Sequence, residues 1–198
     1  MRKFLVLILF PTILALALRA QDTPKLVVFG GYQFLQAGNV DGSNDGASTN
    51  GWNASGTFNF TKHLGVAADF GGSYKGAVAE PAINNNFLPY FHAYTYTFGP
   101  VFSLNSGGKI NPFAHALFGG AHLSPTECVV FGADQCGSNP SYSGLAMMLG
   151  GGLDARTGKH AGFRILQADW VYLPVQGGGG QGGHAKNVRL STGFIFIF

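Results

Sequence analysis

Apolar and polar side chains alternate along most of the chain, in segments of about ten residues separated by turn-forming residues. Successive side chains of a β-strand point to opposite faces, so this two-residue rhythm is typical of strands. No segment after Asp22 has the 3.6-residue apolar period of a long amphipathic helix. The segments lie at 25–36, 51–60, 64–75, 91–104, 111–123, 143–156, 161–173 and 188–198. The sequence therefore predicts an all-β fold of eight strands.

The connections between these segments alternate in length. Long connections, rich in Gly, Asn, Ser and Pro, occupy 37–50, 76–90, 124–142 and 174–187. Short connections with turn-forming sequences occupy 61–63, 105–110 and 157–160. An antiparallel meander with this alternation has its long loops at one end and its tight turns at the other.

One face of the predicted strands is rich in aromatic side chains, and the other face is small and polar. The second strand shows the polar face most clearly, with Asn53, Ser55, Thr57 and Asn59. Rings that lie toward strand ends are typical of the aromatic girdles of membrane barrels. In this chain they are Tyr32, Trp52, Tyr74, Tyr94, Trp170 and Tyr172.

The last predicted strand ends on an alternating apolar run, residues 194–198, with the sequence Phe-Ile-Phe-Ile-Phe. An unpaired edge strand of this kind promotes aggregation of a soluble protein. Pairing it with the first strand removes both edges, and only a closed sheet satisfies its backbone hydrogen bonds in lipid. These features favour a closed membrane barrel over a soluble sandwich.

The first twenty residues predict a secretory signal peptide. Arg2 and Lys3 form a basic start, an apolar run follows at 4–18, and Ala20 supplies a small residue for cleavage. The run contains Pro11 and is shorter than the roughly 20 residues that a membrane-spanning helix needs. We therefore expect residues 1–20 to be removed on export, which leaves a barrel domain at 21–198.

The charge balance excludes some classes of partner. Three of the 12 Lys and Arg residues lie in the first twenty positions, which leaves nine against the 9 Asp and Glu residues. The remaining basic residues do not cluster, so a nucleic-acid partner is not expected. Cys128 and Cys136 predict a disulfide, because an even pair in an exported chain is usually oxidised. Neither lies in a zinc-ligand spacing, so no metal or cofactor is predicted.

Four segments resemble the small OmpA-like and opacity-type outer-membrane β-barrels. They are 59–65 (Asn-Phe-Thr-Lys-His-Leu-Gly), 150–154 (Gly-Gly-Gly-Leu-Asp), 163–169 (Phe-Arg-Ile-Leu-Gln-Ala-Asp) and 189–198 (Arg-Leu-Ser-Thr-Gly-Phe-Ile-Phe-Ile-Phe). The resemblance covers about residues 22–198 and implies a closed eight-stranded antiparallel up-and-down transmembrane β-barrel in the outer membrane. Both termini would then lie in the periplasm.

The same resemblance implies partners. Gly193, Phe194, Phe196 and Phe198 match the C-terminal signal that the barrel-assembly machinery reads in that family. Outer-membrane lipids and lipopolysaccharide would surround the barrel. The sequence has no peptidoglycan-binding domain after the barrel, so we do not expect a role in anchoring the cell wall.

Strand parity predicts which charged side chains face the lumen. They are Asp69, Asp154, Arg156, Asp169 and Arg189, together with Gln167 and His115. Arg164 has the opposite parity to Asp169, which predicts a place near the periplasmic interface. The lumen of an eight-stranded barrel is filled by side chains, and buried charges must pair. We therefore expect a charge network that fastens opposite walls; a proton or ion path is the alternative.

The predicted function is an integral outer-membrane protein with a structural or surface-interaction role and no catalysis. The long loops would hold any extracellular ligand, with aromatic tips at Phe87, Tyr90, Phe131 and Tyr142.

Three alternatives remain open at this point. The first is a deacylase-like enzyme that modifies lipid A with His122 and Ser124, followed by Glu127 in the next loop. The second is a soluble lipocalin-like binder, which requires an apolar lumen and a polar exterior. The third is a narrow ion pore.

Overall fold

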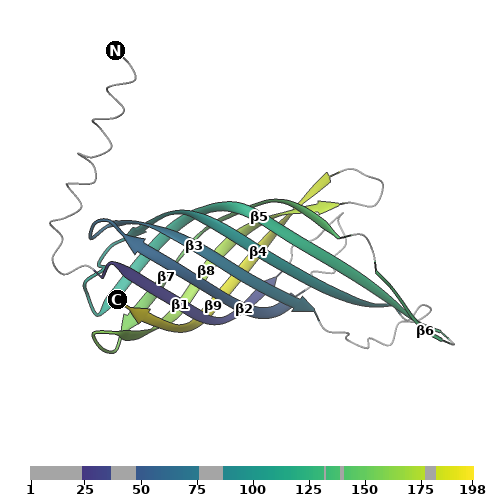
Figure 1. Ribbon diagram of the computed structural model, residues 1–198, viewed down its shortest axis with the longest axis horizontal. Helices are drawn as coiled ribbons and strands as arrows, with labels where there is room; N and C mark the ends of the chain where they lie inside the picture. The colour runs from purple at the N-terminus through teal and green to yellow at the C-terminus, as the bar shows by residue number, and fades with distance from the viewer. Residues whose placement is uncertain (1–23, 37–47, 76–86, 132, 139–140, 177–181) are drawn as a thin grey trace, which may run out of the picture.

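The computed structural model describes residues 24–36, 48–75, 87–131, 133–138, 141–176 and 182–198 (Figure 1). Only the backbone is described at 75, 87–91, 125–131, 133–138, 142, 174–176 and 182–186. The described chain forms the strands β1 (Leu26–Gln36), β2 (Ser48–Asn59), β3 (Leu64–Lys75), β4 (Phe87–Ser103), β5 (Ile110–Phe131), β6 (Ala133–Ser138), β7 (Tyr142–Arg156), β8 (Ala161–Gln176) and β9 (Gly182–Ile197). Within these ranges, no helix is long and apolar enough to cross a bilayer.

Eight of these strands close into an antiparallel barrel. The order around the sheet is β4-β3-β2-β1-β9-β8-β7-β5, and a pairing of β4 with β5 completes the ring. The seam between the first and last strands runs from Val27 opposite Ile197 to Gln36 opposite Val188. The start of β1 and the end of β9 lie at the end that carries the tight turns (Figure 1). The closed eight-stranded fold that the sequence predicts is confirmed.

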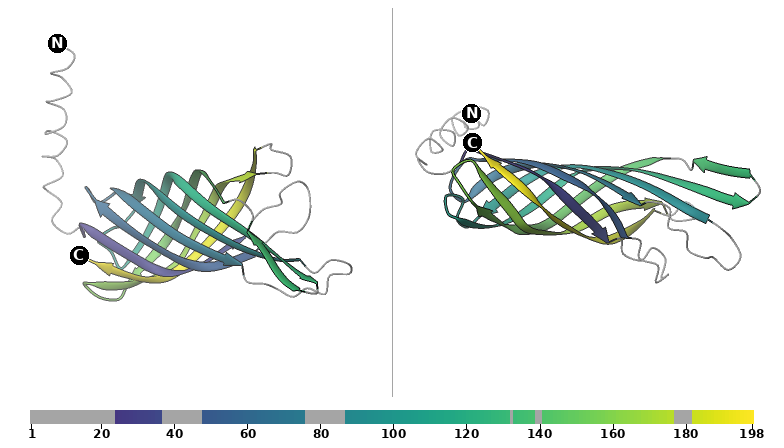
Figure 2. Two further views of the ribbon diagram at one scale, coloured as in Figure 1. Left: turned by 45° about the vertical axis from the view of Figure 1, so that its right-hand side comes forward. Right: turned by 90° about the horizontal axis from the view of Figure 1, so that it is seen from below.

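The main difference from the sequence prediction lies in the connection at 124–142. Instead of a loop, β5 continues to Phe131 and pairs with the short strand β6, from Thr126 opposite Ser138 to Phe131 opposite Ala133. Figure 2 shows this hairpin projecting beyond the barrel. Pro125 and the polar residues around the cysteines suggested a loop, but the extension of β5 pairs with β6 on one side and, as far as Val129, with β4 on the other.

Neighbouring strands are also longer than predicted at the loop end. Phe87 and Tyr90 lie in β4, Phe131 lies in β5, and Tyr142 begins β7. The prediction of loop tips is therefore wrong for the backbone at Phe87, Tyr90 and Tyr142, whereas Phe131 ends β5 at the tip of the projecting hairpin.

The outer wall of the barrel is apolar and the lumen holds the charges. Large apolar side chains point outward from every part of the wall, as shown by Phe98 and Phe194, which are 70% and 65% exposed. The polar side chains Asn53, Ser55 and Asn59 of β2 are buried inside. A lipocalin-like binder has the reverse arrangement, so this alternative is wrong.

The seam between β1 and β9 depends on a close approach of glycine backbones. Gly31 lies opposite Gly193. A β-carbon at Gly31 would lie 2.1 Å from the carbonyl oxygen of Thr192 and 2.8 Å from Cα of Gly193. At the adjacent Gly30, a β-carbon would meet no heavy atom within 4 Å.

We therefore expect Gly31→Ala to lower the free energy of unfolding by about 1–3 kcal/mol, the usual cost of overpacking. The matched variant Gly30→Ala should not lower it. Urea unfolding of the refolded barrel, followed by tryptophan fluorescence, measures both values. Equal stabilities of the two variants would contradict close packing at the seam.

Candidate functional site in the lumen of the barrel

The lumen contains a cluster of ionisable side chains that come from five strands. Asp69 lies on β3, His115 on β5, Asp154 on β7, Asp169 on β8 and Arg189 on β9, and all five side chains are buried. The two-residue period of each strand points them inward while their sequence neighbours face outward. Strands on opposite sides of the ring thereby supply groups to one site.

Arg189 lies between two carboxylates. Its Nη1 donates to Oδ1 of Asp69 at 2.7 Å, and its Nη2 donates to Oδ2 of Asp169 at 2.6 Å. Nε of Arg189 also donates to Oδ2 of Asp169, at 2.8 Å. β9 and β3 are separated by β1 and β2 in the sheet. The Arg189–Asp69 pair therefore spans the lumen rather than joining neighbouring strands.

Neighbouring polar side chains make further hydrogen-bond contacts with the carboxylates of Asp169 and Asp69. Nε2 of His115 lies 2.8 Å from Oδ1 of Asp169, and Nε2 of Gln167 donates to Oδ2 of Asp169 at 2.7 Å. Nδ2 of Asn53 donates to Oδ2 of Asp69 at 3.0 Å. A buried carboxylate is costly unless its oxygens are paired and hydrogen-bonded, and these contacts meet that requirement.

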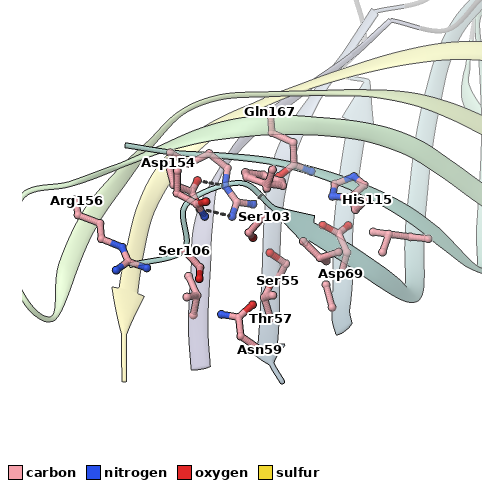
Figure 3. Close-up of a pocket in the computed structure, with 17 residues that line it drawn as sticks. Ser55, Thr57, Asn59, Asp69, Ser103, Ser106, His115, Asp154, Arg156 and Gln167 are labelled. Atoms are coloured by element: carbon pink, nitrogen blue, oxygen red, sulfur yellow. Dashed lines mark hydrogen bonds and ion pairs between the residues drawn. The ribbon is translucent and has the colours of Figure 1, made fainter. Parts of the chain in front are cut away.

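The network continues toward the turn end of the barrel through Arg164. Its Nη1 donates to Oε1 of Gln167 at 2.6 Å, and its Nε and Nη2 bind both oxygens of Asp154, at 2.7 and 3.1 Å. The guanidinium also lies over the rings of Phe29 and Phe113, 4.3 and 4.4 Å from their centroids. Figure 3 shows the Asp154 end of this chain of contacts.

The predicted parity of Arg164 is wrong, although the residue does lie toward the turn end of the barrel. This residue is 4% exposed and faces the lumen, because the pairing of β8 with β9 shifts register between Arg164 and Gln167. Ile165 and Leu166 both face outward as a result, at 46% and 48% exposure. A β-bulge of this kind reverses the parity on one side of it. Two adjacent apolar residues between two polar ones were the signal in the sequence.

Arg156 is the predicted network member that the structure does not bring into the cluster. It lies on β7 nearer the turns and is only partly buried. None of the ion pairs that the described residues form includes it. With Ser55, Thr57, Asn59 and other small polar residues, it lines a cavity that lies toward the turn end of the lumen (Figure 3).

Toward the loop end, the lumen holds a cluster of apolar side chains together with the buried polar side chains Gln33, Thr49, Ser73 and Asn187. Leu35, Leu123 and Leu173 lie near the loop ends of their strands and belong to one buried cluster. Leu117, Ala121, Ala146, Met148 and Val171 continue the same cluster toward the charges. A hydrated ion passing here would have to leave its water, which is unfavourable in an apolar environment.

His122 and Ser124 lie outside the lumen, on the outer wall near the loop end. Oγ of Ser124 lies 3.3 Å from Nε2 of His122, and Nδ1 of the same imidazole lies 2.8 Å from Oγ of Ser143. The side chain of Glu127 lies outside the described residues. The structure therefore joins the predicted His–Ser pair and adds Ser143, which sequence spacing could not reveal because it comes from β7.

The remaining predicted residues are placed as follows. Gly193 lies at the closing seam, and Phe194, Phe196 and Phe198 are exposed on the outer wall. Cys128 is opposite Cys136 in the β5–β6 hairpin, but their side chains lie outside the description, so the disulfide stays a prediction. Among the described residues, no three His, Cys, Asp or Glu side chains are grouped to hold a metal.

Comparisons with known proteins point to the fold. No protein-family model and no curated protein sequence matches the chain. The attachment invasion locus protein Ail of Yersinia pestis is similar in structure, with a TM-score of 0.61 and 20% identity over 89% of this chain and 99% of that one. The chain shares the fold of small outer-membrane barrels.

Two further structures support the same conclusion. Neisserial surface protein A has a TM-score of 0.54 and 14% identity, covering 88% of this chain and 97% of its own. The outer-membrane protein OprG of Pseudomonas aeruginosa has a TM-score of 0.51 and 15% identity, covering 90% and 98%.

Loss of Arg189 should leave two carboxylates unpaired inside the lumen. We expect Arg189→Met to lower the free energy of unfolding by about 3–5 kcal/mol, the usual effect of removing one partner of a buried ion pair. Arg156→Met removes the same charge from outside the network and should cost less than about 1 kcal/mol. Urea unfolding in the same detergent compares the two variants, and similar losses would contradict a central role of Arg189.

Proposed function

We propose that this chain is an integral outer-membrane protein with a structural or surface-interaction role and no catalysis. The observation that carries the proposal is the inverted polarity of the barrel. Its exterior is a continuous apolar surface, whereas Asp69, Asp169 and Arg189 are enclosed within. Exposure of this apolar exterior to water would be unfavourable, whereas its contact with lipid is favourable.

Aromatic side chains near the loop end support this placement. Nε1 of Trp52 donates to the hydroxyl of Tyr74 at 3.1 Å, and the ring of Tyr74 packs edge-on against Tyr94, with centroids 6.0 Å apart. The hydroxyl of Tyr32 donates to Asn50 on the adjacent strand. Such rings mark the level of lipid headgroups. The long loops would then be extracellular, with the turns in the periplasm.

We assign a structural role to the lumen network. Asp69, Asp154 and Asp169 are each paired with a guanidinium. The apolar cluster toward the loop end adds a second obstacle to ions. Paired charges beside a lumen section packed with apolar and polar side chains support a fastened, closed interior better than a proton path or an ion pore.

We place any surface interaction at the extracellular end of the barrel. One structure of Ail is a complex with the heparin analogue sucrose octasulfate, so the fold can present a ligand-binding surface. In this chain the projecting β5–β6 hairpin is the surface on which an extracellular ligand would bind (Figure 2). Phe194, Phe196 and Phe198, exposed on the last strand, fit an assembly signal.

Electrophoresis without boiling tests the membrane barrel. A closed barrel resists detergent denaturation, so we expect the unboiled protein to migrate differently from the boiled protein. We also expect it to fractionate with the outer membrane of cells that express it. Release into the soluble periplasmic fraction without a mobility shift would overturn the proposal.

A second candidate function rests on the contact between Ser124 and His122. An imidazole within hydrogen-bond reach of a hydroxyl can activate it as a nucleophile, and this pair lies near the outer leaflet. The group on the other imidazole nitrogen is the hydroxyl of Ser143 rather than a carboxylate. This arrangement would suit an enzyme that removes an acyl chain from lipid A.

Mass spectrometry of lipid A separates the two functions. If the chain is a deacylase, expression should change the acyl pattern, and Ser124→Ala should abolish the change. Ser48→Ala, an exposed serine on another strand, serves as the control. We expect no change in lipid A with any of the three proteins, and a change that depends on Ser124 would replace the non-catalytic proposal.

A further inference from the structure

The described residues at the turn end of the barrel include four lysines and no exposed carboxylate side chain. Lys25 precedes β1, Lys62 and Lys109 lie in two of the turns, and Lys159 lies in the turn between β7 and β8. The described side chains of Asp69, Asp154 and Asp169 are all buried in the lumen. None of the ion pairs among the described residues involves a lysine.

Part of this positive charge is gathered in one pocket. An open cavity of about 370 Å³ is lined by basic and apolar residues. These residues are Pro24, Lys25, Arg156, Lys159, His160, Ile197 and Phe198. Three cations and one imidazole therefore face a space large enough for a phosphate group.

Backbone hydrogen bonds hold the walls of this pocket in place. Leu26 and Phe198 exchange two bonds, of 3.2 and 2.9 Å, which fix Lys25 beside the last strand. The amide of Ile197 donates to the carbonyl of His160 at 2.9 Å, and Nδ1 of His160 lies 3.2 Å from the carbonyl oxygen of Ile197. These contacts join the β7–β8 turn to the end of β9, so the basic groups lie on a rigid frame.

The pocket lies where the apolar outer wall ends. Phe198 lines it and is 68% exposed, and Phe163 and Phe194, also exposed, pack edge-on with centroids 5.5 Å apart on the neighbouring wall. Figure 2 shows the end of β9 beside the β7–β8 turn. In a bilayer, acyl chains would cover the rings while a headgroup reached the basic residues. This geometry favours a lipid over a soluble anion.

We propose that the pocket binds the phosphate of an anionic phospholipid, such as phosphatidylglycerol, in the periplasmic leaflet. Arg156 forms none of the ion pairs among the described residues, although Asp154 is close enough to interact with it electrostatically, and its guanidinium can donate two parallel hydrogen bonds to a phosphate. Lys25 and Lys159 add charge, and basic residues at a membrane surface each strengthen binding of anionic lipids about fivefold. The proposal rests on the membrane placement given under the proposed function.

Native mass spectrometry of the whole protein in neutral detergent tests the site. We expect phosphatidylglycerol to bind more tightly than phosphatidylcholine. Lys25→Ala/Lys159→Ala should weaken phosphatidylglycerol binding about 25-fold, since each lysine contributes about fivefold. The matched control Lys62→Ala/Lys109→Ala removes the same charge from the same rim outside the pocket, and it should change binding less than about twofold.

Three outcomes would overturn the proposal. Equal losses in the two double variants would show diffuse attraction to the rim, and equal binding of the two lipids would show no preference for negative charge. Displacement of phosphatidylglycerol by an equal concentration of inorganic phosphate would make a soluble anion the ligand. Each result counts against the pocket only if the protein migrates as a heat-modifiable barrel; without that shift, the membrane assignment itself fails.

Discussion

The guanidinium of Arg189 lies between carboxylates from separate parts of the barrel wall, and the rest of the interior is arranged around it. Asp69 and Asp169 are both within hydrogen-bond distance of it. His115 contacts Oδ1 of Asp169, while Gln167 and Asn53 donate to carboxylate oxygens that Arg189 also contacts. An isolated charge in such an interior would cost several kcal/mol, so each partner requires the others. This requirement couples strands that do not touch through the sheet.

The outer wall follows from a complementary constraint. A closed sheet has no free edge, so every strand can present apolar side chains to lipid without exposing backbone polar groups. Close approach at Gly31 and Gly193 allows the first and last strands to meet. The buried charge network and the seam between β1 and β9 therefore both depend on closure of the eight-stranded sheet.

Strand alternation predicted much of this arrangement. Asp69, Asp169 and Arg189 were placed inward by parity alone, because the period of two holds wherever a strand is regular. The error at Arg164 arose where that regularity fails, since the bulge at Ile165 and Leu166 inserts one residue. The projecting β5–β6 hairpin was missed for another reason: its pairing is local and does not show the apolar face of a barrel strand. Ser143 could not be placed beside His122, because only the pairing register brings these two strands together.

The bulge on β8 has a consequence for how such a lumen can change over generations. Inward and outward positions alternate regularly on each side of the bulge, but the alternation shifts by one residue across it. A one-residue deletion at Ile165 or Leu166 would leave a single outward residue between Arg164 and Gln167, so the strand would alternate regularly and both side chains would still face the lumen. With both residues present and no bulge, regular alternation would instead turn Arg164 outward and separate it from Asp154. The bulge therefore allows a strand of this barrel to change in length by one residue and keep its internal ion pair.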